Sequence, residues 1–166
     1  MSEVMVDAAA VMANETNELS CVVIPASGEQ LLLPNVCVAE IVPWRRIKVL
    51  EDGPAWCLGY MGWRSLTIPV VHYGGFGEKR LPAQTPRCLV VMNRARTTSG
   101  VDFYALVADA LPRMVQLIDA DLTTEGDYLS GVNAMQVAFG TETATIPDLA
   151  YLETRISDLV HGLRVS

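Results

Sequence analysis

The stretch Gly59-Tyr-Met-Gly-Trp-Arg-Ser-Leu-Thr-Ile-Pro-Val-Val71 combines a strand-like pattern with two residues that a buried strand avoids. Its apolar side chains predict β-strand. Arg64 is the only charge in the stretch, and Pro69 lacks the N–H that a central strand donates. An arginine here could pair with a carboxylate, contact a partner or take part in catalysis. Each role predicts different residues elsewhere in the chain.

The composition describes a folded, acidic protein. Hydrophobic residues make up 51% of the 166 residues, charged residues make up 19%, and the formal net charge is −7. This is enough chain for one domain, or for two small units that share a core. The acidic balance argues against a binder of nucleic acid or of anionic membranes. No apolar run could span a membrane and no basic segment opens the chain, so we expect a cytoplasmic protein.

Residues that carry enzymatic chemistry are sparse. The four cysteines are widely spaced in apolar surroundings without a CxxC pair, which favours buried free thiols over a zinc site. The glycine-rich segment 74–79 matches no phosphate-binding motif. A small hydrolase built on Ser65 and His72, with Asp109 as a third member, stays an alternative. Otherwise no catalytic set is present, and we expect no enzyme, no cofactor and no metal.

Short β-like runs separated by turn signals dominate the chain from residue 19 onward. Residues 1–18 are acidic and rich in Ala and Met, and we expect a flexible arm outside the folded domain 19–166. A Gly/Pro-rich linker near residue 80 divides this domain into halves at about 19–80 and 81–147. Across residues 148–163, apolar positions recur at intervals of three and four and predict a helix. Its other side carries Glu153, Arg155 and Asp158.

The two halves share short sequence matches. Cys21-Val-Val-Ile24 matches Cys88-Leu-Val-Val91, and Ala39-Glu-Ile-Val-Pro43 matches Ala108-Asp-Ala-Leu-Pro112 in the same order and at similar spacing. A duplication accounts for both matches. We therefore predict two related β units, closed by the C-terminal helix.

At these residues the chain resembles the CheW-like family of bacterial chemotaxis adaptors. The family hallmark Gly-apolar-apolar-Asn-Leu-Arg-Gly-x-apolar-apolar-Pro-Val-apolar-Asp is similar to residues 59–72, and its Val-x-Glu-Ile is similar to residues 38–41. Residues 106–111 and 146–149 resemble two later family elements. The resemblance covers about residues 19–160. It implies a mainly β fold of two five-stranded SH3-like β-barrel subdomains around a shared core, with a C-terminal amphipathic helix.

The resemblance also implies a function. The family is one of non-enzymatic scaffolds that couple chemoreceptors to a CheA-type histidine kinase. The expected partners are the regulatory domain of that kinase and the cytoplasmic tip of the receptors, with no nucleic acid and no insertion into the membrane. The matching motifs place partner binding at Val38, Glu40, Gly59 and Arg64. An SH3-like binding module of another signalling complex stays the second alternative.

Three departures from the hallmark mark a divergent member. Gly62 stands where the family has Asn, and both residues tolerate a left-handed backbone, so we expect the turn to be kept. Ser65 replaces a glycine, and His72 replaces the Asp that ends the strand. Auxiliary adaptors of pilus-linked chemosensory systems, whose output is twitching motility, are one class of divergent members, and the resemblance suggests an assignment to it.

For Arg64 we predict an ion pair with Glu40, because each is the only charge in its apolar run. The alternative is a charge at a strand end that stays hydrated. Gly59 and Gly62 are expected to let a neighbouring strand approach closely, and Pro69 to occupy an edge or a bulge. The sequence offers three further candidate anchors for a partner, provided that they are exposed: Trp44, Trp56 and Trp63.

Overall fold

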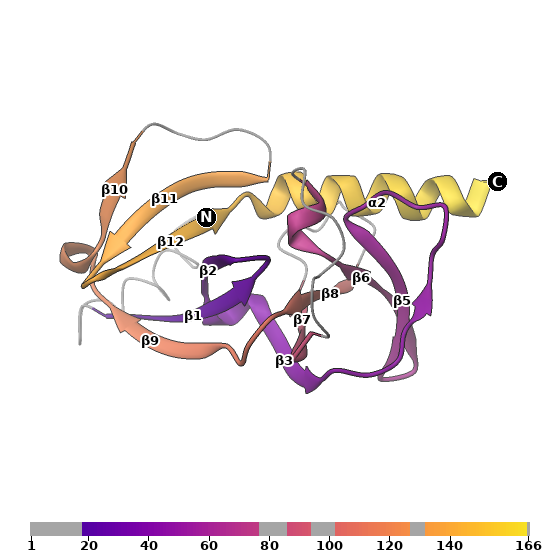
Figure 1. The fold of residues 1–166 in the computed structure, drawn as a ribbon, viewed down its shortest axis with the longest axis horizontal. Coiled ribbons are helices and arrows are strands. Elements are labelled where there is room, and N and C mark those ends of the chain that lie inside the picture. The colour runs from indigo at the N-terminus through magenta and orange to yellow at the C-terminus, as the bar shows by residue number, and fades with distance from the viewer. Residues whose placement is uncertain (1–17, 77–85, 94–101, 127–131, 166) are drawn as a thin grey trace, which may run out of the picture.

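The computed structural model describes residues 18–76, 86–93, 102–126 and 132–165 (Figure 1). The predicted N-terminal arm lies outside these residues, except for the exposed Glu18. The described strands form two six-stranded sheets, and the chain ends in one helix. The mainly β prediction with a C-terminal helix is confirmed. None of the described helices is long and apolar enough to cross a membrane.

Sheet A has the order β10-β11-β12-β2-β1-β9. Its strands are β1 (Leu19–Ala26), β2 (Glu29–Pro34), β9 (Arg113–Leu117), β10 (Thr123–Glu125), β11 (Asn133–Phe139) and β12 (Glu142–Pro147). Sheet B has the order β3-β7-β8-β6-β5-β4. Its strands are β3 (Val38–Pro43), β4 (Lys48–Val49), β5 (Cys57–Trp63), β6 (Leu66–Val71), β7 (Cys88–Asn93) and β8 (Phe103–Ala108). The expected five strands per unit become six because short edge strands, β10 and β4, add to each sheet.

The two sheets repeat one topology. Sheet B read as β4-β5-β6-β8-β7-β3 matches sheet A strand for strand, and the parallel pair β6–β8 corresponds to the parallel pair β12–β2. Each sheet takes one hairpin from one half of the chain and four strands from the other half. The hairpin β1–β2 joins β9–β12, and the hairpin β7–β8 joins β3–β6. The boundary near residue 80 therefore does not coincide with the division into sheets.

The hairpins β5–β6 and β11–β12 correspond residue for residue. The pairs Cys57↔Val71 and Trp63↔Leu66 of sheet B match Asn133↔Pro147 and Phe139↔Glu142 of sheet A, and each ladder shifts register after its first pair. The predicted duplication is thus confirmed in the topology.

The short matches that suggested the duplication do not align equivalent positions. Cys21 faces the core of sheet A, whereas Cys88 faces the core between the sheets, so the first match is one residue out of register. Residues 39–43 lie within β3, but Ala108 ends β8, so the second match has no structural counterpart. Short apolar runs recur by chance in an apolar chain. An alignment that is shifted by one residue along a strand compares side chains on opposite faces of the sheet.

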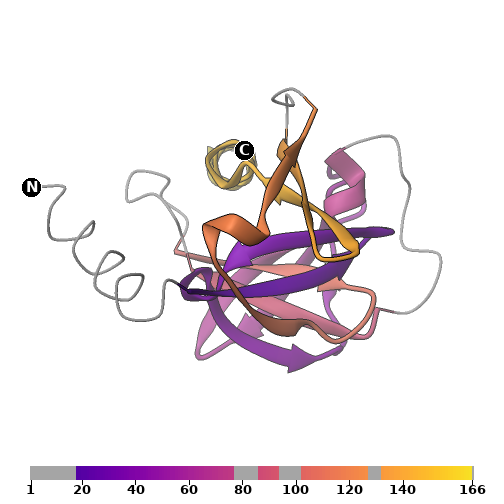
Figure 2. The same cartoon turned by 90° about the vertical axis from the view of Figure 1, so that its left-hand side faces the viewer.

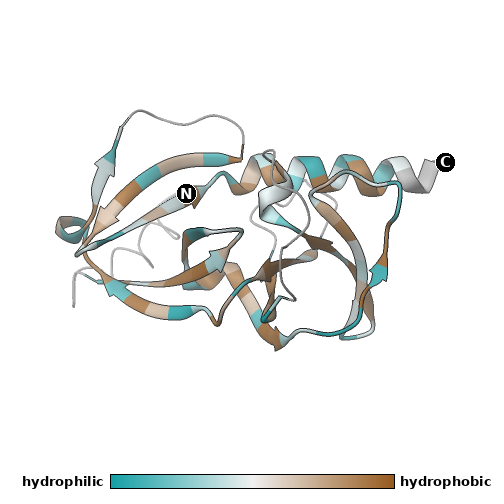
Figure 3. Ribbon diagram, viewed as in Figure 1, coloured by the Kyte–Doolittle hydropathy of each residue, from teal (hydrophilic) through white to brown (hydrophobic). Residues whose placement is uncertain are grey.

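The core has three parts. A shared core lies between the sheets and under the helix, and a smaller cluster lies inside each sheet. Strand β7 alternates between them: Cys88, Val90 and Met92 enter the shared core, while Leu89 and Val91 enter the cluster of sheet B. Because both faces are buried, such strands are apolar throughout, as the brown central strands of Figure 3 show.

All four cysteines are free. Cys21, Cys57 and Cys88 are buried and Cys37 is half-buried, and desolvation raises the pKa of each thiol. The prediction of buried free thiols therefore holds for three of them.

Helix α2 (Leu149–Val165) begins one residue later than predicted and runs along the sheets (Figures 1 and 2). The Asp148 carboxylate accepts a hydrogen bond from the Tyr151 N–H at 3.0 Å and caps the first turn. Leu152 and Ile156 are fully buried in the shared core. The solvent-facing placement of Glu153 was wrong, since that side chain is 1% exposed.

Glu153 follows Leu152 on the helix and is buried with it at the margin of the face that packs on the shared core. Desolvation raises the pKa of Tyr104 and of Cys37, and the charge of Glu153 raises both further. The carboxylate therefore belongs to the shared core.

Candidate functional site

The hairpin β5–β6 turns through two residues in the left-handed region. Arg64 has φ 47° and Ser65 has φ 65°, which is the pattern of a type I′ turn between twisted strands. Glycine suits these positions, so the replacement of the family's glycine by Ser65 leaves a strained residue in the turn. Gly62 has no left-handed backbone and lies within β5. The turn is kept, as expected, but Gly62 does not supply its left-handed backbone.

Gly59 allows β4 to approach β5. A Cβ atom at Gly59 would lie 1.9 Å from the carbonyl oxygen of Lys48, so no side chain fits there. The predicted close approach is confirmed at Gly59 and is absent at Gly62, where the nearest atom would be 4.0 Å away. Pro69 pairs with Tyr60 of β5, and the parallel ladder to β8 begins only at Val70. The missing N–H of Pro69 therefore leaves that ladder intact.

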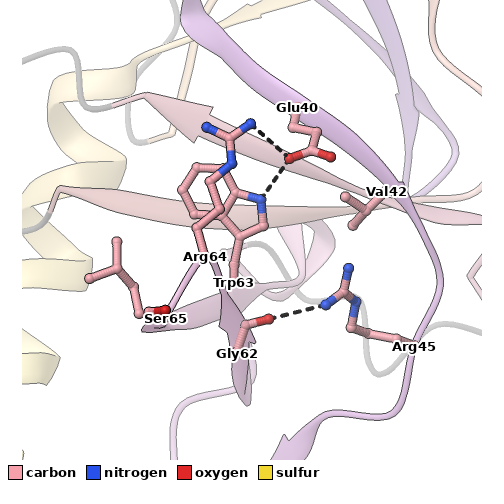
Figure 4. A pocket seen from close by; sticks show the side chains of 8 residues that line it. Glu40, Val42, Arg45, Gly62, Trp63, Arg64 and Ser65 are labelled. Carbon is pink, nitrogen blue, oxygen red and sulfur yellow. Dashed lines mark hydrogen bonds and ion pairs between the residues drawn. The ribbon is translucent and has the colours of Figure 1, made fainter.

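Glu40 and Arg64 form the predicted ion pair. Arg64 Nη2 lies 3.2 Å from Glu40 Oε1, and the two side chains are 65% and 42% exposed. Trp63 Nε1 donates a hydrogen bond of 3.0 Å to the same carboxylate oxygen. The guanidinium of Arg64 also stacks 4.6 Å above the Trp63 ring (Figure 4). One carboxylate and one indole therefore fix the position of an exposed arginine.

Trp63 is the residue of this site that the sequence analysis placed only among possible exposed anchors. Its side chain is 6% exposed and its ring packs 4.7 Å from Phe103. A buried indole needs an acceptor for its N–H, and Glu40 supplies it. Tryptophan next to Arg64, in place of the family's leucine, is the signal that could have identified this contact.

A hollow of about 450 Å³ lies beside the ion pair. It lies between β3, the β3–β4 connection and the β5–β6 hairpin, and its walls include Glu40, Val42, Arg45 and Trp63. Arg45 Nη1 donates a hydrogen bond of 3.2 Å to the carbonyl oxygen of Gly62 (Figure 4). Two arginines therefore border one surface hollow, and each is anchored by a hydrogen bond.

Residues 20–152 match the model of the CheW-like domain. The chain belongs to the CheW-like domain family. Among solved structures it is similar to the crystal structure of the scaffolding protein TtCheW from Thermoanaerobacter tengcongensis, with 16% sequence identity and a TM-score of 0.65. The similarity covers 79% of this chain and 89% of that chain, and at this identity it shows the fold. No curated protein sequence matches the chain.

Of the four residues predicted to bind partners of this CheW-like protein, two are at the surface and two lie below it. Glu40 and Arg64 meet at the surface. Val38 is half-buried and packs against the shared core, and Gly59 is buried where β5 meets β4. The register shift between Val38 and Glu40 in the β3–β7 ladder points these side chains to different surroundings.

The hydrolase alternative is wrong. CheW-like scaffolding proteins are non-enzymatic, and Ser65 and His72 stand at opposite ends of β6. Six strand residues separate them by about 20 Å. His72 is buried with its Nδ1 3.3 Å from Ser27 Oγ, and Asp109 accepts the N–H of Gly28 at 3.2 Å. His72 and Asp109 therefore hold the β1–β2 turn.

The tryptophans are packed rather than exposed. Trp56 is 4% exposed and stacks on Phe76 with ring centroids 5.0 Å apart, and Trp44 is half-buried against the sheet B cluster. With Trp63 also buried, no tryptophan stands free as an anchor. The charges beside Trp63 are the exposed groups of the site.

Proposed function

We propose that this CheW-like protein is a cytoplasmic, non-enzymatic adaptor that couples chemoreceptors to a CheA-type histidine kinase. The family match over residues 20–152 supports the scaffold class. The observation that carries the proposal is the exposed Glu40–Arg64 pair on the Trp63 ring. We assign partner binding to this surface, with Val38 and Gly59 as the residues that shape it from below.

The pair suits recognition better than stability. Half-exposed ion pairs contribute about 0–1 kcal/mol to folding because water screens them. Arg64 uses Nη2 on Glu40, and its planar fork carries further N–H donors for a carboxylate or a carbonyl of the partner. Such charges set the orientation and the choice of partner more than the raw affinity.

The finer assignment is to a pilus-linked chemosensory system with twitching motility as its output. The departures from the family hallmark at Gly62, Ser65 and His72 support it. Deletion of the gene should then impair twitching and leave swimming intact. Loss of swimming alone would assign the protein to a flagellar system.

The test of the adaptor function is Arg64→Glu. This change places a second negative charge beside Glu40 and removes the donor fork. Binding to the kinase regulatory domain or to the receptor tip should weaken about tenfold, or ~1.4 kcal/mol, in titration calorimetry. The melting temperature should stay nearly unchanged, since the side chain is 65% exposed.

Arg113→Glu is the matched control. Arg113 is an exposed arginine of sheet A, paired with Glu142, and its reversal changes the net charge by the same amount. It should leave the affinity for both partners unaltered. Parent-like binding by Arg64→Glu would refute the role of the pair, and unfolding would assign Arg64 to the core. A parent chain that binds neither partner would favour a module of another signalling complex.

A further inference from the structure

The equivalent connections of the two sheets carry opposite charge. The β3–β4 connection and β4 contain Arg45, Arg46 and Lys48, with no acidic residue from Ile41 to Leu50. The matching connection of sheet A and β10 contain three acidic residues and no basic one: Asp119, Asp121 and Glu125. All six charged side chains are exposed. The β3–β4 connection with β4, here called the basic end, therefore carries three positive charges in a protein of net charge −7, and the acidic pair Glu51 and Asp52 follows it directly.

The basic end contains the hollow. Arg45 and Arg64 lie on different sides of Trp63, and each donates one hydrogen bond to another of the described residues (Figure 4). A guanidinium has five N–H donors, so both arginines keep donors for a ligand. Trp63 and Val42 supply an apolar wall between them.

We propose that this hollow binds an acidic segment of the partner protein, with a carboxylate between Arg45 and Arg64. The identity of the partner rests on the proposed adaptor function, while the ligand chemistry rests on the hollow itself. Glu40 already takes Arg64 and the Trp63 N–H on one oxygen. Arg45 and Arg64 carry two positive charges and Glu40 carries one negative charge, so the lining of the hollow has a net positive charge. The methylene groups of a Glu or Asp side chain fit the apolar wall, and its carboxylate meets the donors.

Charge favours an acidic protein over other anions. Nucleic acids and anionic membranes present charge over long surfaces and require an extended basic face. Here the basic residues gather at one end, and the equivalent end of the other sheet is acidic and repels such a surface. A short acidic segment needs only the hollow.

The experiment compares Arg45→Glu, Arg45→Lys and the matched control Arg113→Glu in binding to the kinase regulatory domain and to the receptor tip at several salt concentrations. Arg45→Glu should weaken binding about tenfold at low salt and flatten the salt dependence of the association rate. Arg45→Lys should keep the salt dependence, and Arg113→Glu should bind within about twofold of the parent. Equal binding by Arg45→Glu and the parent would overturn the proposal.

A second measurement is independent of the adaptor function. An octaglutamate peptide, added at low salt, should shift the NMR signal of the Trp63 indole N–H, and Arg45→Glu should abolish the shift. An octaglutamine peptide should have no effect. Equal shifts with both peptides, or binding to phosphatidylserine vesicles in preference to octaglutamate, would overturn the proposal. If the peptide result holds and the parent binds neither the kinase domain nor the receptor tip, the adaptor function fails and the acidic-segment site stands.

Discussion

Each sheet carries one ion pair between its edge strand and its β5–β6-type hairpin, and the two pairs have opposite sense. Glu40 of β3 lies opposite Val91 in its ladder, and Arg113 of β9 lies opposite Val23 at the matching position. Glu40 pairs with Arg64 of the β5–β6 turn, and Arg113 pairs with Glu142 at the start of β12. Each pair joins one edge strand to a hairpin near the other edge, so both sheets curl toward closure. The backbone repeats while the charges reverse.

The two hairpin turns differ in how they are built. Sheet A turns at Gly140, with φ 59° and open space around a would-be Cβ. Sheet B turns at Arg64 and Ser65, both left-handed and neither a glycine. Phe139 and Trp63 precede these turns at equivalent positions, each 6% exposed. The turn of sheet A has glycine at its left-handed position and is unstrained. The turn of sheet B has two strained residues, Arg64 and Ser65, and the first of them lies over the indole of Trp63.

The largest effect should come from Gly59→Ala, where the sheets differ most in packing. The equivalent residue of sheet A is Met135, whereas a Cβ at Gly59 would lie 1.9 Å from the backbone oxygen of Lys48. We expect a loss of roughly 3 kcal/mol or more in chemical denaturation, because backbone and not a flexible side chain must move. Gly62→Ala is the control and should cost much less, since its nearest atom would be 4.0 Å away. Similar losses at both glycines would contradict the close approach of β4.

Trp63→Phe gives sheet B the residue that sheet A has at Phe139. The change removes the N–H donor to Glu40 and part of a buried ring, which should cost about 2 kcal/mol in the free energy of unfolding. Trp56→Phe is the matched control, because Trp56 is similarly buried and its Nε1 has no hydrogen-bond partner in the described part of the chain. The loss at Trp63 should exceed the loss at Trp56 by about 1 kcal/mol. Equal losses would show that the Trp63–Glu40 hydrogen bond contributes nothing.

Hydrophobic periodicity and the spacing of motifs predicted most of the fold. The strand content and the helix follow from apolar patterns that local physics imposes. The duplication is present in the topology, but the short matches that suggested it do not align equivalent positions. The exchange of hairpins between the halves does not follow, because each half contains the same strands whichever sheet its hairpin joins. Edge strands of two and three residues, β4 and β10, are also too short to produce a periodic signal.

The site was predictable as far as single residues stand out from their surroundings. Glu40 and Arg64 are isolated charges in apolar runs, and their pairing followed from that contrast. Arg45 lies in a run of basic residues, so nothing in its neighbourhood indicates that it borders the same hollow. Glu153 was misplaced because helical periodicity describes the helix alone and not the width of the face that packs on the shared core.

Removing glycine from the turn of sheet A should destabilise the protein, and introducing glycine into the turn of sheet B should stabilise it. Gly140→Ala should destabilise the protein by about 1 kcal/mol, and the cost should lie in the backbone alone because no atom crowds the new Cβ. Ser65→Gly should stabilise it by about 0.5 kcal/mol, since relief of strain exceeds the entropy that glycine adds to the unfolded chain. Thermal and denaturant unfolding measure both changes. A destabilising Ser65→Gly would mean that the Ser65 side chain, and not its backbone, matters.

The smallest effect should come from the ion pairs themselves. Double-mutant cycles to alanine should give a coupling of about 0.5 kcal/mol for Arg113–Glu142, whose side chains are 45% and 43% exposed. Glu40–Arg64 should give a similar value once Trp63 is already Phe, because the indole no longer shares the carboxylate. The reversed pair Arg113→Glu with Glu142→Arg, which gives sheet A the charge sense of sheet B, should fold as stably as the parent. A coupling above about 2 kcal/mol in either sheet would assign the pair to closure of that sheet. If the large coupling were that of Glu40–Arg64, Arg64→Glu would act by opening sheet B, and its weaker partner binding would no longer report on recognition.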